Sequence, residues 1–167
     1  MIADATVTVL VATDPTARDL GRILRTLVST ADDRRAQSQT PIRTWAVLGE
    51  VRTDDGLSEN EHVVEHDRIG RQAVRLAVDK VLCVGPTRAV RALHQGAVME
   101  GSWGDEARLA EDPADAAPVL HADPDWTPQP GDVVLVAGPD VPLAEIVAVW
   151  RERLGRAVVE VDAATGS

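Results

Sequence analysis

The chain has 167 residues and a formal net charge of -10 at pH 7, and both properties exclude classes of protein. The length suits one domain with a hydrophobic core, so we expect a single domain over residues 1–167. With four Trp and no Phe or Tyr, aliphatic side chains must build most of that core. We expect no nucleic-acid partner, because phosphate binding requires a basic face and Lys80 is the single lysine.

Cys83 is the one cysteine of the chain and lies in an apolar run at 81–84. A lone cysteine cannot form an intramolecular disulfide, which is typical of a reducing compartment. We interpret it as a core residue rather than a nucleophile. No apolar run approaches the ~18 residues of a membrane span, and no signal peptide is expected. These features predict a cytoplasmic protein without membrane contact.

Short apolar runs alternate with amphipathic segments along the chain. Asp14-Pro15 combines an N-cap residue with proline at the first helical position, and Ser58 to Glu61 has the spacing of a capping box. Residues 31–40 are interpreted as a polar loop and Gly96 as a helix stop. In order, we expect a strand at 6–12, a helix at 15–29, a strand at 45–48, a helix from 59, a strand at 80–84, a helix at 88–95, a short helix from 112, a strand at 133–137, a helix at 142–154, an edge strand at 157–161 and a frayed tail after 162.

The predicted strands are continuously apolar, as expected for strands covered on both faces. Their alternation with helices indicates an α/β fold, a doubly wound, Rossmann-like, three-layer domain with a mostly parallel sheet. In such sheets, ligands bind outside the carboxyl ends of the strands. We therefore expect a site built from the loops at 13–14, 49–50, 85–86 and 138–139 and from the start of the helix that carries His62 and His66.

Two nucleotide-binding motifs are absent from the sequence. A phosphate loop requires glycine-rich backbone and a lysine beside Ser or Thr, whereas Lys80 directly precedes an apolar strand. A G-x-G-x-x-G turn is absent as well. The sequence therefore predicts no ATP hydrolysis by this chain alone, and no catalytic residue is assigned.

His62 and His66 lie one helical turn apart and allow two interpretations. With Glu65 they match H-x-x-E-H, in which two histidines bind zinc and the glutamate activates water. That pattern needs a third protein ligand in a large domain, which favours a coincidental pair, so no metal site is assigned. His66 itself is either a capped, half-buried structural histidine, or a residue that faces a ligand or supports the residues that do.

Gly85 and Gly138 each end a strand and precede a helix. Free amides and the helix dipole at such a point favour anions, but Pro86 and Pro139 each remove a donor. A tight strand-to-helix turn also explains both glycines. The acidic residues between 100 and 125 are interpreted as a solvated face, which includes Asp105, Glu106, Glu111, Asp112 and Asp115.

Several segments, taken together, resemble one known family. They are AVLGE at 46–50, EHDRIGRQAV at 65–74, VLCVG at 81–85 and PGDVVLVAG at 130–138. In this order they resemble the C-terminal domain of the Mur ligases of peptidoglycan synthesis, the glutamate ligase domain family. The resemblance is closest to the branch of UDP-N-acetylmuramoyl-tripeptide D-alanyl-D-alanine ligases. It covers roughly residues 5–154, which we take as the core of the domain.

The resemblance implies a Rossmann-like domain that closes over an ATP-binding central domain and contacts nucleotide and the incoming amino acid or dipeptide. Complete ligases of this family form an acyl phosphate and then a peptide bond, using ATP and magnesium. By position, the resemblance implies cofactor contacts at Thr13, Asp14, Pro15, Gly49, His66 and Gly138.

The sequence departs from the family pattern at two turns. Thr13-Asp14-Pro15 replaces an Asn-Pro turn, and Ala137-Gly138-Pro139 replaces a Lys-Gly-Ser turn. No segment resembles the family's N-terminal substrate domain or its central phosphate-loop domain. ATP and magnesium are therefore expected only together with those domains, and neither is expected to bind tightly to this chain alone.

Two functions are consistent with this sequence. In the first, the chain is the C-terminal domain of a Mur-type ligase, either excised from it or encoded separately, with the catalytic machinery on another polypeptide. In the second, it is a degenerate, non-catalytic relative that serves as a binding or protein-interaction module. Under both, the isolated chain is expected to be inactive.

Overall fold

The computed structural model describes residues 6–102, 106–155 and 158–162. Within these ranges, six strands form one sheet in the order β4-β3-β2-β5-β1-β6, and each neighbouring pair is parallel. β5 therefore lies between β1 and β2. The strands are β1 (Val7–Thr13), β2 (Thr44–Leu48), β3 (Lys80–Val84), β4 (Ala107–Ala110), β5 (Val133–Gly138) and β6 (Val158–Asp162).

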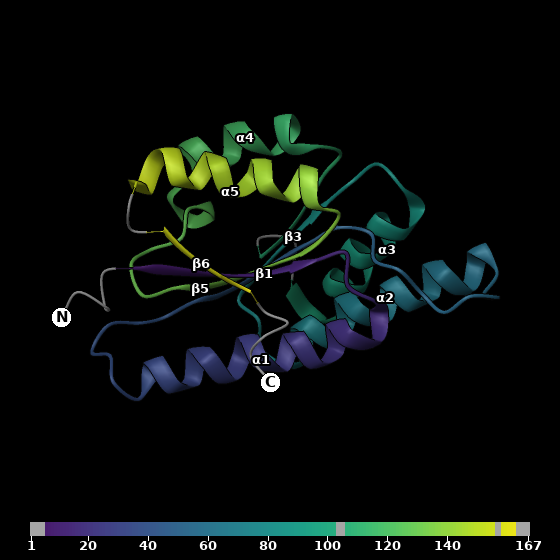
Figure 1. Cartoon of the computed structure of the whole chain (residues 1–167), viewed down its shortest axis with the longest axis horizontal. Helices are drawn as coiled ribbons and strands as arrows, with labels where there is room; N and C mark the ends of the chain where they lie inside the picture. Colours follow the sequence, from purple (N-terminus) through teal and green to yellow (C-terminus); the bar gives the residue numbers. More distant parts are fainter. Residues whose placement is uncertain (1–5, 103–105, 156–157, 163–167) are drawn as a thin grey trace.

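Helices cover both faces of the sheet (Figure 1). Because successive strand residues point to opposite faces, Leu48 packs with the layer of α1, α2 and α3, and Val47 packs with the layer of α4 and α5. The predicted α/β, Rossmann-like, three-layer fold is confirmed. The helices are α1 (Ala17–Arg35), α2 (Glu59–Arg75), α3 (Arg88–Ala97) with a following π-helical turn (Val98–Ser102), α4 (Pro113–Ala122), a short 3-10 helix (Pro124–Trp126) and α5 (Asp140–Leu154).

The first helix differs from the prediction at both ends. Its N-cap is Thr16, whose side chain accepts a hydrogen bond from an amide of the first turn, and not Asp14. The helix continues to Arg35, so the predicted polar loop at 31–40 is wrong over its first half. Ala31 is buried, and the Arg35 guanidinium donates to the Ile42 carbonyl at 2.8 Å. These contacts stabilise the helical conformation of residues 31–35, although most of their side chains are polar.

The acidic segment between 100 and 125 contains more structure than predicted. Its short helix is confirmed as α4, with Asp112 as N-cap and Pro113 in the first turn. The sequence gives no indication of β4, because this strand is only four residues long and has one neighbour. The predicted solvated residues Glu106, Glu111, Asp112 and Asp115 are exposed, and Asp105 lies outside the described residues.

Two glycines allow α2 and α3 to pack with their backbones in contact. A Cβ on Gly70 would lie 2.0 Å from the Leu93 carbonyl oxygen, and one on Gly96 would lie 2.2 Å from the Asp67 carbonyl oxygen. Gly96 therefore does not end α3 as predicted, since the helix runs past it into the π-helical turn. Its role is the close approach of the two helices.

The C-terminal part of the chain largely follows the prediction. The last helix begins at Asp140, two residues earlier than expected. The predicted edge strand is confirmed as β6, which pairs with β1 at one edge of the sheet. Residue 157 and the tail after 162 lie outside the described residues. Whether the whole chain is a single domain stays a prediction.

Cys83 lies fully buried in β3. Burial raises the pKa of its thiol to about 12, so the thiolate is not populated near neutral pH, and the interpretation as a core residue is confirmed. Among the described residues, no helix has the length and apolar character needed to cross a membrane.

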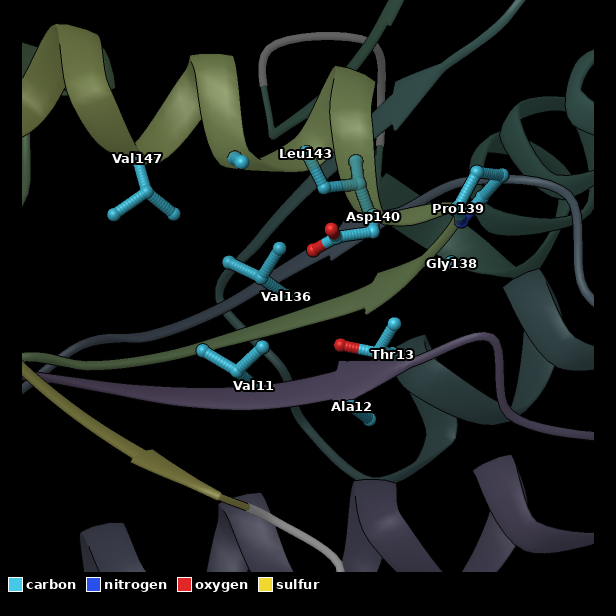
Figure 2. Close-up of a pocket in the computed structure, with 10 residues that line it drawn as sticks. Val11, Ala12, Thr13, Val136, Gly138, Pro139, Asp140, Leu143 and Val147 are labelled. Carbon is cyan, nitrogen blue, oxygen red and sulfur yellow. The ribbon is translucent and has the colours of Figure 1, made fainter.

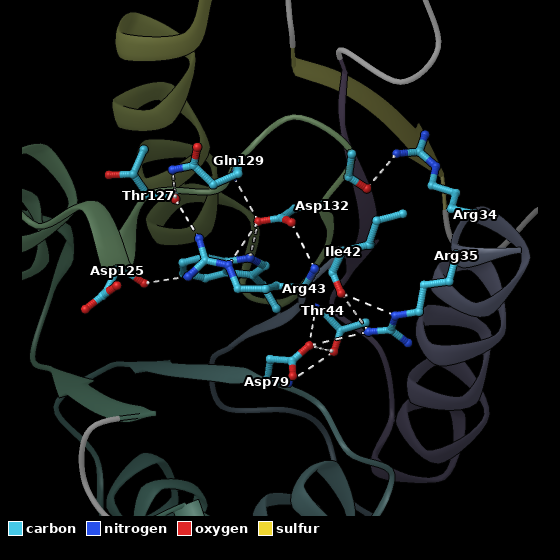
Figure 3. A network of polar contacts seen from close by, with 12 residues as sticks. Arg34, Arg35, Ile42, Arg43, Thr44, Asp79, Asp125, Thr127, Gln129 and Asp132 are labelled. Atoms are coloured by element: carbon cyan, nitrogen blue, oxygen red, sulfur yellow. Dashed lines mark hydrogen bonds and ion pairs between the residues drawn. The ribbon is translucent and has the colours of Figure 1, made fainter. Parts of the chain in front are cut away.

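At the amino ends of the strands, Asp132 is a buried carboxylate with several donors around it (Figure 3). It accepts hydrogen bonds from the Arg43 amide at 2.9 Å, the Trp45 indole at 3.0 Å and the Gln129 amide at 2.8 Å. The Arg43 guanidinium lies 3.5 Å away and supplies the opposite charge. One side chain thus ties the turn before β5 to the start of β2.

A second carboxylate joins β2 to β3 at the same amino ends of the strands, which we call the amino edge of the sheet; the opposite ends form its carboxyl edge. Asp79, which precedes β3, accepts from the Thr44 amide at 2.8 Å and lies 3.6 Å from the Arg35 guanidinium (Figure 3). The Asp79 amide in turn donates to the Thr44 carbonyl at 3.1 Å. We call the contacts of Asp132 and Asp79 the amino-edge network.

Candidate functional site

The carboxyl ends of β1, β2 and β5 form the candidate site. After β1 and β2 the chain passes to α1 and α2 on one face, whereas after β5 it passes to α5 on the other. Because β5 lies between β1 and β2, the connection after β5 leaves on the opposite face from those after its two neighbours. Open α/β sheets bind ligands at such a point. Three of the four predicted loops, at 13–14, 49–50 and 138–139, meet at this point, and the fourth follows β3.

Backbone hydrogen bonds join the three loops. The Asp14 amide donates to the Gly138 carbonyl at 2.9 Å, and the Gly49 amide donates to the Ala137 carbonyl at 2.9 Å. A Cβ on Gly138 would lie 2.9 Å from the Gly49 Cα, and Gly138 has a φ of +147°. The contact thus requires glycine at 138 for both space and backbone conformation. We call these segments, 13–17, 49–53 and 137–140, the joined loops.

Arg52 connects the first two of the joined loops. Its carbonyl accepts from the Ala17 amide at 2.7 Å, and its own amide donates to the Pro15 carbonyl at 3.3 Å. Its guanidinium donates to the Asp14 carbonyl at 3.0 Å and lies 3.2 Å from the Asp14 carboxylate. Asp14 adopts a φ of +49°, an uncommon conformation for a residue with a side chain. The Asp14 carboxylate is thus paired with the Arg52 guanidinium.

A small pocket of about 110 Å³ lies between α5 and the ends of β1 and β5. The Thr13 hydroxyl and the Asp140 carboxylate point into it among apolar side chains (Figure 2). Gly138 and Pro139 form the adjoining turn. This arrangement offers one neutral hydroxyl and one anionic acceptor to a ligand, with aliphatic walls on either side.

His66 lies behind these loops with no exposed surface. Its Nε2 accepts from the Val51 amide at 3.0 Å, and its Nδ1 donates to the His62 carbonyl at 2.8 Å. Burial lowers the pKa of His66 below its ordinary value of 6.5. The neutral form with the proton on Nδ1 satisfies both partners. His66 is thus fully buried rather than half-buried, and it contacts the loop after β2 instead of facing the pocket.

His62 lies closer to the surface and has different partners. Its Nδ1 lies 2.7 Å from the Thr53 hydroxyl, and its Nε2 lies 3.5 Å from a Glu50 carboxylate oxygen. Both nitrogens of His66 are already used, so a zinc ion bound by the pair would break one of those hydrogen bonds. In the described part of the chain, no three His, Cys, Asp or Glu residues are placed to hold a metal ion.

The two strand-to-helix turns with glycine differ in their capping. After Gly85, the N-cap of α3 is Thr87, whose hydroxyl accepts from the Val90 amide at 3.3 Å. After Gly138, the N-cap of α5 is Pro139, and no side chain caps that helix. The amides at the start of α5 are thus the ones left without a side-chain acceptor, but Asp140 adds a negative charge beside them.

Of the six predicted contact residues, the structure brings five together. Thr13 and Gly138 line the pocket, while Asp14, Pro15 and Gly49 lie in the joined loops behind it. His66 is separated from the pocket and reaches the loops through Val51. Sequence reasoning missed Val51, Arg52 and Asp140, since an apolar residue and two charged ones in turns carry no motif. A cofactor role for the six residues stays a prediction.

Comparison with known proteins identifies relatives of this chain. It is 47% identical over 104 residues to the UDP-N-acetylmuramoyl-tripeptide–D-alanyl-D-alanine ligase of Mycobacterium leprae, a match that covers 62% of this chain and 19% of that protein. It is 45% identical over 107 residues to the same-named ligases of Mycobacterium bovis and Mycobacterium tuberculosis, covering 60% of this chain and 20% of each. The chain is therefore a relative of the Mur ligases.

The relationship confirms the predicted resemblance to the C-terminal domain of a Mur ligase. The chain spans about a fifth of the length of these relatives. No family model matches it, and no solved structure matches it significantly.

Proposed function

We propose that this chain provides the C-terminal domain of a Mur-type ligase of peptidoglycan synthesis. In that reaction an amide bond joins D-alanyl-D-alanine or an amino acid to a UDP-muramoyl peptide. The observation that carries the proposal is the 45–47% identity to ligases with this activity in their names. The joined loops, at the switch point of the sheet, are the surface that would face the other domains.

The residues at this edge do not fit ATP and magnesium by themselves. Lys80, the one lysine, begins β3 at the opposite edge and lies 5.1 Å from the Trp126 ring. The Arg52 guanidinium is engaged by Asp14, and Asp140 places a negative charge where phosphates would approach. We propose that ATP and magnesium are held mainly by the phosphate-loop domain of the ligase, and that the isolated chain forms no amide bond.

One observation favours a second function, a non-catalytic binding or interaction module. The family's Lys-Gly-Ser turn corresponds to Ala137-Gly138-Pro139, and Ala137 is fully buried in β5. No cation reaches the edge from that position. If nucleotide contacts are lost, the preserved fold would serve contact with another protein of cell-wall synthesis.

A thermal-shift titration of the purified chain separates the two functions, because a ligand that binds the native state raises the unfolding midpoint. The ligands are ADP, ATP with magnesium, D-alanyl-D-alanine and a UDP-muramoyl tripeptide. If the ligase function is correct, we expect a midpoint rise with D-alanyl-D-alanine or the UDP-muramoyl tripeptide, and little rise with nucleotide, because ATP and magnesium are held mainly by the phosphate-loop domain. A rise with none of the four would contradict it and favour the interaction module.

Two matched variants localise any such shift. Thr13→Val removes the hydroxyl that points into the pocket beside Asp140. Thr26→Val removes a hydroxyl on α1, which donates to the Arg22 carbonyl away from the joined loops. The ligand-induced rise should shrink in Thr13→Val and stay unchanged in Thr26→Val. An equal loss in both variants would place the binding elsewhere.

A further inference from the structure

His66 is a fully buried histidine whose two ring nitrogens have opposite hydrogen-bonding roles. Nδ1 donates to the carbonyl of His62 one turn earlier in α2, and Nε2 accepts from the amide of Val51. The first contact lies within the helix, whereas the second leaves it and fixes the loop that follows β2. A helix position is thus coupled to a loop through a single acceptor atom.

The Val51 contact leads directly into the joined loops. Val51 is buried, and its neighbour Arg52 pairs in both directions with the loop before α1, through the Ala17 amide and the Pro15 carbonyl. The Asp14 amide then reaches the Gly138 carbonyl at the end of β5. A continuous path of hydrogen bonds therefore runs from His66 to the turn that lines the pocket.

Protonation of His66 would turn its attractive hydrogen bond with the Val51 amide into a repulsive contact. A charged imidazole carries a hydrogen on Nε2, so two donors would face each other across the present 3.0 Å separation. The charged groups around the ring are Glu50 from the loop and His62 and Glu65 from α2. The two carboxylates favour the charged ring and His62 opposes it, while burial opposes it most strongly.

We propose that His66 is a positioning residue: as a neutral acceptor it holds Val51, and through it the joined loops, and its protonation releases them. The inference rests on the proposed function in one respect, because that proposal makes the joined loops the surface that faces a ligand. The loop behaviour itself is a property of the ligand-free chain. A ligand at this edge would accordingly bind more weakly at acidic pH than at neutral pH.

Nuclear magnetic resonance of the ligand-free chain tests the proposal without any ligand. Long-range correlations of the imidazole report the tautomer, and amide exchange reports the protection of Val51, Asp14 and Ala17. We expect the Nδ1–H tautomer at about pH 7.5. Lowering the pH until the imidazole signals report a proton on both ring nitrogens of His66 should reduce the protection at all three amides. A tautomer with the proton on Nε2 would overturn the proposal.

Three variants separate positioning from simple packing. In His66→Gln the side-chain oxygen can still accept from Val51 but does not titrate, so protection should persist and lose its pH dependence. His66→Asn retains a polar group near the His62 carbonyl but is too short to reach Val51, so protection there should fall about 10- to 100-fold at every pH, as for a lost buried hydrogen bond. His62→Gln keeps the backbone carbonyl that His66 contacts, so Val51 should stay protected at about pH 7.5. Because the His62 side chain opposes a charge on His66, the loss of protection on acidification should begin at a higher pH than in the parent chain.

The outcomes distinguish this proposal from the proposed function. Equal protection of Val51 in His66→Asn and the parent, or an unchanged pH dependence in His66→Gln, would overturn the positioning role. Absence of a thermal shift with all four ligands, with the loop behaviour as expected, would instead contradict the ligase function and leave the positioning role supported. The parent chain's own pH titration needs no variant and stands even where a variant fails to fold.

Discussion

At the amino edge of the sheet, charged side chains connect the strands, whereas at the carboxyl edge the backbone does so. Asp132 is buried and accepts three hydrogen bonds. The donors are Trp45 in β2, Arg43 just before β2, and Gln129 in the turn before β5. The joined loops are held mostly by amide-to-carbonyl contacts such as Asp14 to Gly138. The first edge depends on the identity of its side chains, and the second depends mainly on backbone conformation.

This difference shows where sequence change is tolerated. Because the contacts are made by backbone, side chains that point into the pocket, such as those of Thr13 and Asp140, should be replaceable with little loss of shape at the carboxyl edge. A buried carboxylate with several donors leaves those donors unpaired when it is replaced. The amino edge is therefore expected to be the more sensitive of the two.

The largest expected effect is that of Asp132→Ala. It leaves the Trp45 indole and two backbone amides without their acceptor and the Arg43 guanidinium without its counter-charge. We expect the free energy of unfolding to fall by about 3–5 kcal/mol, measured by urea denaturation. Asp54→Ala, which removes an exposed ion pair with Arg18, is the matched control. A similar small change in both variants would contradict the importance of the amino-edge network.

A smaller effect is expected from Gly138→Ala at the carboxyl edge. The new Cβ would lie 2.9 Å from the Gly49 Cα, so the joined loops must separate, at a cost of about 1–3 kcal/mol. Gly56→Ala is the control, since Gly56 has a φ of +90° but no atom near its Cβ position. Both variants place a Cβ at a positive φ, but only Gly138→Ala adds the close contact with Gly49, so Gly138→Ala should be the more destabilising. Equal costs would show that the loops can part freely.

The pH dependence follows from His66 and should be modest. Because burial depresses its pKa in the folded chain, the unfolded chain binds more protons as the pH falls below the ordinary value, and stability is lost as the pH falls through the folded value. We expect the urea midpoint of the parent chain to decrease on acidification more than that of His66→Gln. Parallel curves for the two proteins would show that His66 does not contribute.

The smallest effect is expected from Arg52→Ala. Arg52 and Asp14 have side chains that are 63% and 60% exposed, so their ion pair should contribute under about 1 kcal/mol. The backbone hydrogen bonds of residue 52 with Ala17 and Pro15 stay in place in this variant. We expect an almost unchanged urea midpoint and increased amide exchange limited to the segment around Asp14. A loss comparable to that of Asp132→Ala would remove the contrast between the two edges.

The sequence predicts the elements that carry their own local signals. The capping box of Ser58 and Glu61 is present at the start of α2. The apolar strands β2, β3 and β5 are buried along almost all of their length, as expected for a sheet covered on both faces. β4 was missed because its four residues have one neighbouring strand and include Arg108, which lies over Trp126. The last turns of α1 were missed because tertiary contacts of arginine side chains, not periodicity, hold them.

The candidate site was predictable in location but less so in its contacts. Parallel strands bring their carboxyl ends to one edge, so the loops at 13–14, 49–50 and 138–139 could be placed together from the fold class alone. The two interpretations of His66 could not be separated, because the choice depends on Val51, which a loop delivers to it. The engagement of Asp14 by Arg52 likewise depends on the path of two loops that are distant in sequence.

The central place of β5 also governs the order in which the sheet can be completed during synthesis. β1 pairs with β5 and β6, and β2 pairs with β3 and β5, so the two halves of the sheet have no strand in common until β5 leaves the ribosome. A nascent chain that ends before Val133 therefore presents unpaired edges on β1 and β2. Such intermediates are prone to aggregate, and we expect translation beyond this strand to be the step that makes the chain competent to fold.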